Sequence, residues 1–280
     1  MAKIFTSTSG SGTREGLVRA MEANVQETAA LWGRVLGCQI HSTPEVDWFL
    51  SGTQLSMFNG IIRAQLSTEN IDTQIERLLA PFRERDLPMA WLTFPSTTPD
   101  NLGKHLLKHG LALDERLPGM AVDLRNLPLD EAPPVGITIK VVENAAEMEQ
   151  WIYTLSEGSS FPPFVTTLLL DILQRQGYRQ SEHYRPYSAL RKGRVVGTSL
   201  LSPGGGLAGI YNVCTLPEER GRGIGRAVTL AALRSAYARG YHYATLQSSK
   251  MGLPIYRRLG FEELCTFEFY FLPASTWQAG

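Results

Sequence analysis

The order of apolar and polar positions divides the chain into alternating helical and extended segments. Apolar residues at spacings near three and four predict helices over residues 14–36, 71–85, 102–109, 145–156, 166–175, 226–239 and 253–260. Short apolar runs bounded by turn residues predict strands over residues 46–50, 55–66, 89–94, 118–124, 137–142, 187–191, 195–201, 207–216, 243–248 and 264–272. This alternation predicts an α/β protein.

One segment interrupts the alternation and predicts a domain boundary. Residues 126–136 read NLPLDEAPPVG and hold three prolines with few residues that could pack in a core. At 280 residues the chain is long enough for two domains of about 100–150 residues each. We therefore expect one domain over residues 1–127 and a second over residues 128–280.

The two predicted domains share an order of elements. In the first, GIIRAQL leads to a helix, the strand MAWLTF, a loop and the helix LGKHLLKHG. In the second, GIYNVCTL leads to a helix, the strand YATLQS, a loop and the helix LPIYRRLG. The glycine-rich loop of the second domain has no counterpart in the first, where only STEN separates Leu66 from Ile71. A duplication whose first copy lost this loop and a chance likeness of two α/β units both stay open.

Composition narrows the class of protein. The 27 basic and 27 acidic residues give a formal net charge of zero, which argues against a nucleic-acid binder. No apolar run approaches the ~20 residues of a membrane span, and the first residues lack the apolar core of a signal peptide. Three cysteines form no CxxC pair, and five scattered histidines suggest no metal site. We expect a cytoplasmic protein with no membrane partner; a homodimer stays open.

A glycine- and arginine-rich loop is the clearest chemical signal. The sequence RGRGIGR, residues 220–226, lies where a predicted strand gives way to an alanine-rich helix. A helix N-terminus presents unpaired backbone N–H groups and the positive end of the helix dipole, which suits phosphate. Glycines in such a loop let a ligand approach the backbone closely. The loop therefore predicts a diphosphate site.

Three known uses of such loops compete with a plain glycine turn. A Rossmann dinucleotide site needs a third glycine where Arg226 stands, and an acidic residue about 20 positions later. No Asp or Glu occurs between Arg220 and Phe261. A Walker P-loop needs Lys and Ser or Thr after the last glycine, and neither follows. Seven arginines and one lysine lie between Arg220 and Arg258, which favours coenzyme A, a ligand with a diphosphate and a ribose phosphate.

These residues resemble the GNAT superfamily of acetyl-CoA-dependent N-acetyltransferases. Arg220, Gly223 and Gly225 match its first signature of Arg or Gln, two residues, Gly, any residue, then Gly or Ala. Its second signature has a counterpart in Ser249, Gly252, Tyr256 and Gly260-Phe261, with Ser249 in place of the usual Asn. The resemblance is specific over residues 136–272 and rests on the repeat over residues 14–125.

The resemblance implies a fold and a set of site residues. It implies two GNAT-like domains, each a mixed and mostly antiparallel sheet flanked by helices, with a degenerate first domain that binds no coenzyme A. It makes Tyr256 the acid that protonates the departing thiolate. It makes acetyl-CoA the co-substrate, without a metal, held by Val213, Cys214, Thr215, Leu216, Arg220, Gly221, Arg222, Gly223, Ile224, Gly225, Arg226 and Ser249.

The implied function is transfer of an acetyl group from acetyl-CoA to a primary amine of a small molecule or an amino-acid-like acceptor. Direct attack is expected, with Cys214 as a buried packing residue. The general base stays open among Glu157, Glu182, His183 and Glu219. The loop over residues 157–165 is expected near the acceptor, with Phe161 and Phe164 either lining it or packed in the core. The alternative is a non-catalytic acyl-CoA-binding or protein-interaction module.

Overall fold

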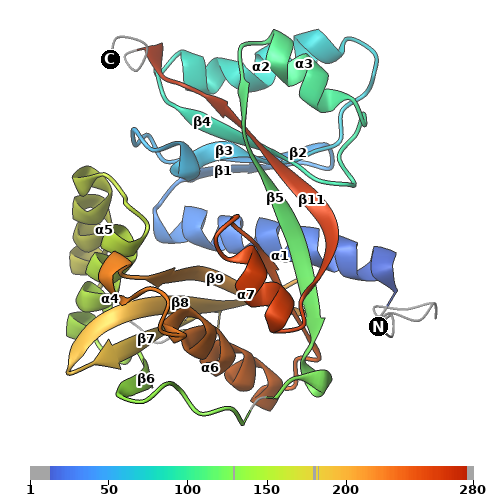
Figure 1. The fold of residues 1–280 in the computed structure, drawn as a ribbon. Helices are drawn as coiled ribbons and strands as arrows, with labels where there is room; N and C mark the ends of the chain where they lie inside the picture. The colour runs from blue at the N-terminus through green and yellow to red at the C-terminus, as the bar shows by residue number, and fades with distance from the viewer. Residues whose placement is uncertain (1–12, 129, 179–180, 182, 276–280) are drawn as a thin grey trace. The chain divides into compact units, whose positions relative to one another are not determined.

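The computed structural model describes residues 13–128, 130–178, 181 and 183–275. Its contacts divide the chain into two compact units (Figure 1). Unit 1 holds residues up to Asn24 and the segment Met120–Glu263, and unit 2 holds Val25–Gly119 with the segment from Leu264 onward. The long helix α1, Arg14–Val35, contributes its first half to unit 1 and its second half to unit 2.

Unit 2 is a sheet with two helices packed on it. Its strands follow the order β1-β2-β3-β4-β11, with bounds Gln39–Ser42, Val46–Leu50, Asn59–Ala64, Met89–Thr93 and Glu262–Leu272. The helices are α2, Ile71–Arg83, and α3, Leu102–Lys108. The core is closed around Trp91, Phe82 and Ile75, all fully buried. The amphipathic period of α2 places Ile71, Ile75, Leu78 and Phe82 on its buried face.

Unit 1 contains the glycine loop in a larger sheet. Its strands follow the order β5-β10-β9-β8-β7-β6, with bounds Ala112–Asp123, Tyr243–Gln247, Leu207–Thr215, Arg194–Gly204, Arg185–Arg191 and Ile137–Val141. Its other helices are α4, Ala145–Gly158; α5, Pro163–Gln176; α6, Ile224–Ala238; and α7, Leu253–Arg258. The short 3-10 turns are Ser56–Phe58 in unit 2, and Leu124–Asn126 and Pro217–Glu219 in unit 1. Val228, Leu233 and Phe261 belong to the core of unit 1.

The last strand of each half of the sequence contributes to the other unit. β11 pairs antiparallel with β4, from Glu268 opposite Thr93 to Leu272 opposite Met89. The end of β5 belongs to unit 1, where the Met120 carbonyl accepts a hydrogen bond from the Thr245 hydroxyl at 3.1 Å. The units therefore do not coincide with residues 1–127 and 128–280, because each half gives up a strand. A domain boundary in the linker over residues 126–136 stays a prediction, and it concerns where the two sequence repeats meet.

The predicted mixed sheet is confirmed, with one parallel strand pair in each unit. β3 pairs parallel with β4 through Gly60–Ala90 and Ile61–Trp91, and β9 pairs parallel with β10 through Ala208–Ala244 and Gly209–Thr245. The pairs β1–β2, β2–β3, β4–β11, β6–β7, β7–β8 and β8–β9 are antiparallel. A helix separates the two strands of each parallel pair in the sequence, as a crossover requires. The shared order of elements noticed in the sequence is thus present in the structure.

The two parallel strand pairs differ in how the chain continues after the paired residues. In unit 2, the chain after β3 stays joined to the loop after β4, since the Leu66 N–H donates to the Thr98 carbonyl at 2.9 Å. The Thr98 hydroxyl also donates to the Gln65 side chain at 2.8 Å. This bridge closes the gap between β3 and β4. In the described part of unit 1, no such bridge joins the chain after β9 to the chain after β10.

Most predicted elements lie where the pattern placed them, and the differences have local causes. The predicted strand over residues 55–66 begins with a 3-10 turn and becomes strand only at Asn59. β5 starts at Ala112 instead of 118, because it pairs along more of its length than its apolar stretch indicates. α5 begins at Pro163, a residue preorganised for the first helical turn, so the predicted acceptor loop shrinks to residues 159–162. The strand β1 is fully exposed and carries no apolar pattern, which is why it was missed.

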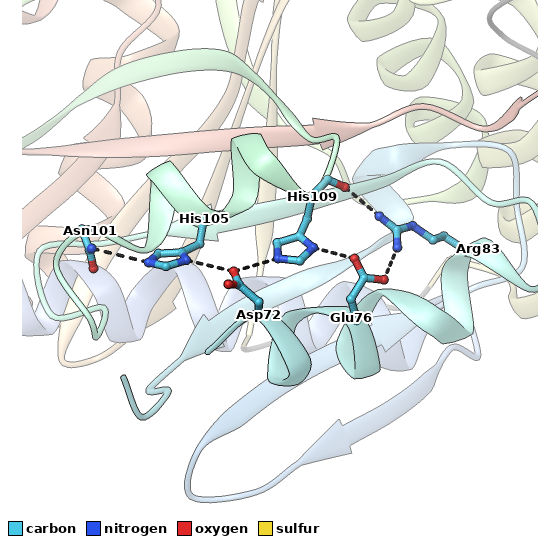
Figure 2. A network of polar contacts seen from close by, with 6 residues as sticks. All are labelled: Asp72, Glu76, Arg83, Asn101, His105 and His109. Carbon is cyan, nitrogen blue, oxygen red and sulfur yellow. Dashed lines mark hydrogen bonds and ion pairs between the residues drawn. The ribbon is translucent and has the colours of Figure 1, made fainter. Parts of the chain in front are cut away.

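A network of polar side chains joins α2 to α3 in unit 2 (Figure 2). Asp72 Oδ1 lies 3.0 Å from His105 Nδ1 and 2.9 Å from His109 Nε2. His109 Nδ1 lies 2.5 Å from Glu76 Oε1, and Arg83 pairs with the same carboxylate. Arg83 also donates to the His109 carbonyl at 2.6 Å. These contacts hold the end of α3 against α2.

Candidate active site

Strands β9 and β10 separate at the end of the sheet that holds the glycine loop. Beyond Gly209, β9 runs on to Thr215 and is paired on its other edge with β8, where Cys214 lies opposite Thr198. The β8–β9 register shifts between Thr198 and Leu200, and Asn212 has φ of 50°. A bulge of this kind bends a strand and changes the direction of its backbone groups. The divergence leaves a space between the two strands.

The glycine loop ends at the N-terminus of α6. Gly223 caps the helix with φ of 76°, a left-handed conformation that glycine adopts without strain. The first intrahelical bond closes from Ala227 N–H to the Gly223 carbonyl at 3.0 Å. The N–H groups before it have no partner within the helix and are available to an anion. The predicted helix over residues 226–239 therefore begins two residues earlier, at Ile224, and the loop is correspondingly shorter.

A cavity of about 760 Å³ lies between this loop, the end of β9 and α7. Most of the residues expected at a coenzyme site line it: Val213, Cys214, Thr215, Arg220, Gly221, Gly223, Ile224, Gly225, Arg226, Ser249 and Tyr256. Two expected residues do not. Leu216 is buried in the core of unit 1, and Arg222 is turned to Glu219 at 3.1 Å. Their side chains are therefore not part of the cavity wall.

The structure adds lining residues that the signatures did not assign to the site. They are Gly158, Ser159, Ser160, Glu219, Met251, Gly252, Ile255 and Arg258. Gly158 is the last residue of α4, Ser159 is its C-cap, and Ser160 follows in the loop. All three lie within the segment 157–165 that the resemblance placed near the acceptor, and the structure adds that they line the same cavity as the glycine loop. Arg258 and Ile255 lie on the same helix as Tyr256, so their proximity to the site could be predicted from the sequence.

Tyr256 is a buried side chain on α7 that reaches the cavity wall. Its ring packs edge-on against Phe261 at 5.7 Å between centroids. Burial raises the pKa of Tyr256 to about 12, an effect that a hydrogen bond with Thr229 partly offsets. The phenol is thus neutral at physiological pH, and it keeps an O–H that it can donate to a group that arrives in the cavity.

Arg220 ties the loop to the end of α4. Its Nη2 donates to the Gly158 carbonyl at 3.0 Å, and its Nε donates to the Thr215 carbonyl at 3.2 Å. An arginine at a helix C-terminus satisfies a carbonyl that lacks an intrahelical partner and complements the helix dipole. The signature arginine therefore connects two walls of the cavity through its side chain.

Cys214 packs beneath the same helix end. Its Sγ lies 3.1 Å from Thr198 Oγ1 and 3.4 Å from the Thr154 carbonyl. Burial raises the pKa of the Cys214 thiol, so the thiolate is disfavoured. A Cβ on Gly158 would lie 2.7 Å from this sulfur, which shows how closely α4 approaches β9. The geometry agrees with the expected packing role.

The structure places the described candidates for a general base poorly for accepting a proton from an amine in the cavity. Glu219 lines the cavity, but its carboxylate is held by Arg191 at 2.9 and 3.1 Å and by Arg222. Glu157 lines a different cavity and lies 3.8 Å from Arg194. His183 is exposed and Glu182 lies outside the described residues.

Phe161 and Phe164 do not line the cavity, and Phe164 is 44% exposed at the start of α5, so neither is plain core.

The described residues offer neither a metal-binding cluster nor a membrane-spanning helix. Among the described residues, no group of three or more His, Cys, Asp or Glu side chains is arranged to hold a metal ion. None of the helices in the described part of the chain has both the length and the apolar character that a membrane crossing needs. Among the described residues, Cys38, Cys214 and Cys265 form no disulfide.

Comparisons with known proteins place this site in a family. Residues 182–263 match the family described as acetyltransferase (GNAT) domain. The chain is 30% identical over 148 residues to a mycothiol acetyltransferase of Thermobispora bispora, which covers 48% of this chain and 49% of the relative. The chain therefore spans about half the length of the curated relative it matches.

Solved structures show the fold over nearly the whole chain. A GCN5-related N-acetyltransferase from Kribbella flavida superposes with a TM-score of 0.70 at 20% identity, covering 91% of this chain and 97% of that one. A tandem GNAT protein from the clavulanic acid biosynthesis pathway superposes with a TM-score of 0.56 at 14% identity, covering 90% and 97%. The chain therefore has a tandem GNAT-like fold, and its residues 182–263 match an acetyltransferase domain of the GNAT family.

Proposed function

We propose that the protein transfers an acetyl group from acetyl-CoA to a primary amine of a small molecule or an amino-acid-like acceptor. The observation that carries this proposal is the cavity in which the N-terminus of α6, the free edge of β9 and the Tyr256 side chain converge. Its volume of about 760 Å³ lies within the range of roughly 300–1,000 Å³ that small-molecule and cofactor sites occupy.

The residues present suit acetyl-CoA. The backbone N–H groups from Gly221 to Arg226 would hold the diphosphate at the helix N-terminus. The edge of β9 over Val213–Thr215, left without a parallel neighbour where β10 turns away, would hydrogen-bond the pantetheine arm as an added strand does. Leu216 would not take part, since its N–H donates to the Val196 carbonyl and its carbonyl accepts from the Glu219 N–H. Ser249 accepts a hydrogen bond from the Gly252 N–H at 3.2 Å, and its role would be to shape the turn before α7.

The chemistry needs few side chains. The neutral amine nitrogen attacks the thioester carbonyl carbon, the carbon–sulfur bond breaks, and the nitrogen loses one proton while the sulfur gains one. Backbone N–H donors of β9 stabilise the oxyanion, and one such donor contributes about 3 kcal/mol. Tyr256 donates its O–H to the departing sulfur. Because a phenol with a pKa of about 12 is a weaker acid than an alkyl thiol of pKa ~8.5, Tyr256 stabilises the departing thiolate by this hydrogen bond, and the sulfur takes its proton from water.

The proton lost by the amine goes to water in the cavity in this scheme, because Glu219 is held by two arginines.

The Ser159 and Ser160 hydroxyls at the end of α4 would contact the acceptor. The name of the relative, mycothiol acetyltransferase, supports a small-molecule acceptor. Unit 2 would have a structural role, since the Gln65–Thr98 bridge closes the gap between its parallel strands.

Isothermal titration with acetyl-CoA tests the first half of the proposal, and binding in the micromolar range is expected. A panel of small amines, assayed by thiol release with a chromogenic disulfide, tests the second half. Binding without transfer to any amine would favour a non-catalytic acyl-CoA-binding module. No binding at millimolar acetyl-CoA would refute both.

A further inference from the structure

Three arginines line the proposed coenzyme cavity, and they differ in what their guanidinium groups already bind. Arg220 donates to the carbonyls of Gly158 and Thr215. Arg226 forms a two-bond ion pair with Glu131, with Nε–Oε1 at 2.8 Å and Nη2–Oε2 at 2.6 Å. The third, Arg258, lines the cavity from α7.

Two glutamates, Glu131 of the linker and Glu219, form ion pairs with arginine side chains of the loop. Glu131 also accepts a hydrogen bond from Arg234 through its backbone carbonyl. Arg222 pairs with Glu219 at 3.1 Å and lies outside the cavity wall. Breaking a two-bond arginine–carboxylate pair to free the guanidinium for a ligand would cost much of what the ligand returns. The arginines that make the loop look so basic in sequence are therefore occupied.

Arg258 is different. It is exposed, it lines the cavity, and within the described ranges of the chain its side chain has no hydrogen-bond or ion-pair partner. Its neighbour Arg257 points elsewhere, since it pairs with Glu263 at 2.8 Å and does not line the cavity. Arg258 can therefore bind an anionic group without giving up a partner.

We infer that Arg258 is the cation that binds the ribose 3′-phosphate of coenzyme A, an assignment that rests on the proposed function. The diphosphate is provided for by the backbone N–H groups at the start of α6. Arg258 lies on another element, α7, with its side chain toward solvent. A second anionic group at the solvent-facing end of the ligand matches that position, and the ribose 3′-phosphate is the remaining one.

The test removes in turn the positive charge of Arg258 from the protein and the 3′-phosphate from the ligand. Isothermal titration compares coenzyme A with 3′-dephospho-coenzyme A on the natural protein, on Arg258→Ala and on Arg257→Ala. We expect Arg258→Ala to bind coenzyme A about tenfold more weakly and dephospho-coenzyme A unchanged, as a charge-assisted contact near solvent predicts. Arg258→Lys should keep part of the difference, and Arg257→Ala should behave as the natural protein.

The alternatives have distinct outcomes. An equal loss for both ligands would overturn the assignment and place Arg258 at the diphosphate, and no loss for either would remove it from the site. Both results leave the proposed function standing, because the natural protein still binds coenzyme A. Failure of the natural protein to bind either ligand would instead remove the proposed function. Circular dichroism of Arg258→Ala checks that this exposed substitution leaves the fold intact.

Discussion

Arg220 Nη2 lies 3.0 Å from the backbone oxygen of Gly158, across 62 positions of sequence. This bond joins the arginine of the glycine loop to the last residue of α4. Hydrogen bonds from charged donors contribute about 1.5–3 kcal/mol each, so the pair at Gly158 and Thr215 is strong enough to fix the end of α4.

Arg220→Ala should therefore loosen residues 155–161. Hydrogen exchange of that segment should speed up, and acetyl transfer should fall by about tenfold to a hundredfold while the affinity for coenzyme A changes less. Arg257→Ala, an arginine outside the cavity, serves as the control. A further reporter is the Cys214 thiol, measured after Cys38 and Cys265 are replaced by serine. If Cys214 stays unreactive and exchange is unchanged, Arg220 does not hold α4.

Tyr256→Phe tests the donor to the sulfur. We expect kcat to fall about tenfold to a hundredfold, since one hydrogen bond to a developing charge is lost, and the dissociation constant of coenzyme A to change less than about twofold. Titration calorimetry and steady-state kinetics separate the two effects. Unchanged kcat on a true acceptor would take Tyr256 out of the reaction.

The pKa of Tyr256 makes a prediction about pH as well. A tyrosine with an ordinary pKa of ~10 would be half deprotonated at pH 10 and would lose its donor. Because burial raises the pKa of Tyr256 to about 12, the natural enzyme should show no loss of kcat from this group between pH 8 and 10. A basic limb in that range that disappears in Tyr256→Phe would contradict the placement of the side chain in a buried environment.

Gly158→Ala should destabilise unit 1. The new Cβ would lie 2.7 Å from Cys214 Sγ and 3.2 Å from its Cβ, and overpacking of this kind typically costs about 1–3 kcal/mol. Cys214→Ala removes the nearer atom, so the double variant should recover part of the loss in chemical denaturation. Simple addition of the two single effects would show that Gly158 and Cys214 are not in contact.

The His109 network predicts a pH dependence of stability in unit 2. Partial burial lowers the pKa of His109, but its hydrogen bonds to Asp72 and Glu76 outweigh this and raise the pKa overall. A raised pKa means that the stabilisation is complete below the unfolded value of ~6.5 and is lost as pH rises through the folded value. Hydrogen exchange of α2 and α3 should therefore be slower at pH 6 than at pH 8, after correction for intrinsic rates.

The same network also responds to acid. Hydrogen bonds from His109, first of all, lower the pKa values of Asp72 and Glu76, so their contribution is present above about pH 4 and is lost as pH falls further. Unit 2 should thus be most stable between these limits. In His109→Gln the alkaline loss should vanish, and its persistence would assign the effect to groups other than His109.

The sequence alone determined the order of elements, the place of the glycine loop before α6 and the place of Tyr256 on α7. These features are encoded locally: apolar period sets helix or strand, and glycines at a strand-to-helix turn set the loop. It also indicated the repeat that became one parallel strand pair in each unit. The boundaries of α5, α6 and β5 were less well predicted, because a terminus depends on capping and pairing as well as on period.

Only the tertiary structure decided which strands belong together and which arginines are available. The exchange of β5 and β11 follows from pairing between distant segments, and no local pattern encodes it. Glu131 meets Arg226 across 95 positions, so a loop that is uniformly basic in sequence has partners for most of its charges in space. A charge acts on a ligand only if no nearer partner holds it, and that depends on the folded arrangement. For this reason Arg258, and not the arginines of the loop, is the residue on which we place the phosphate contact.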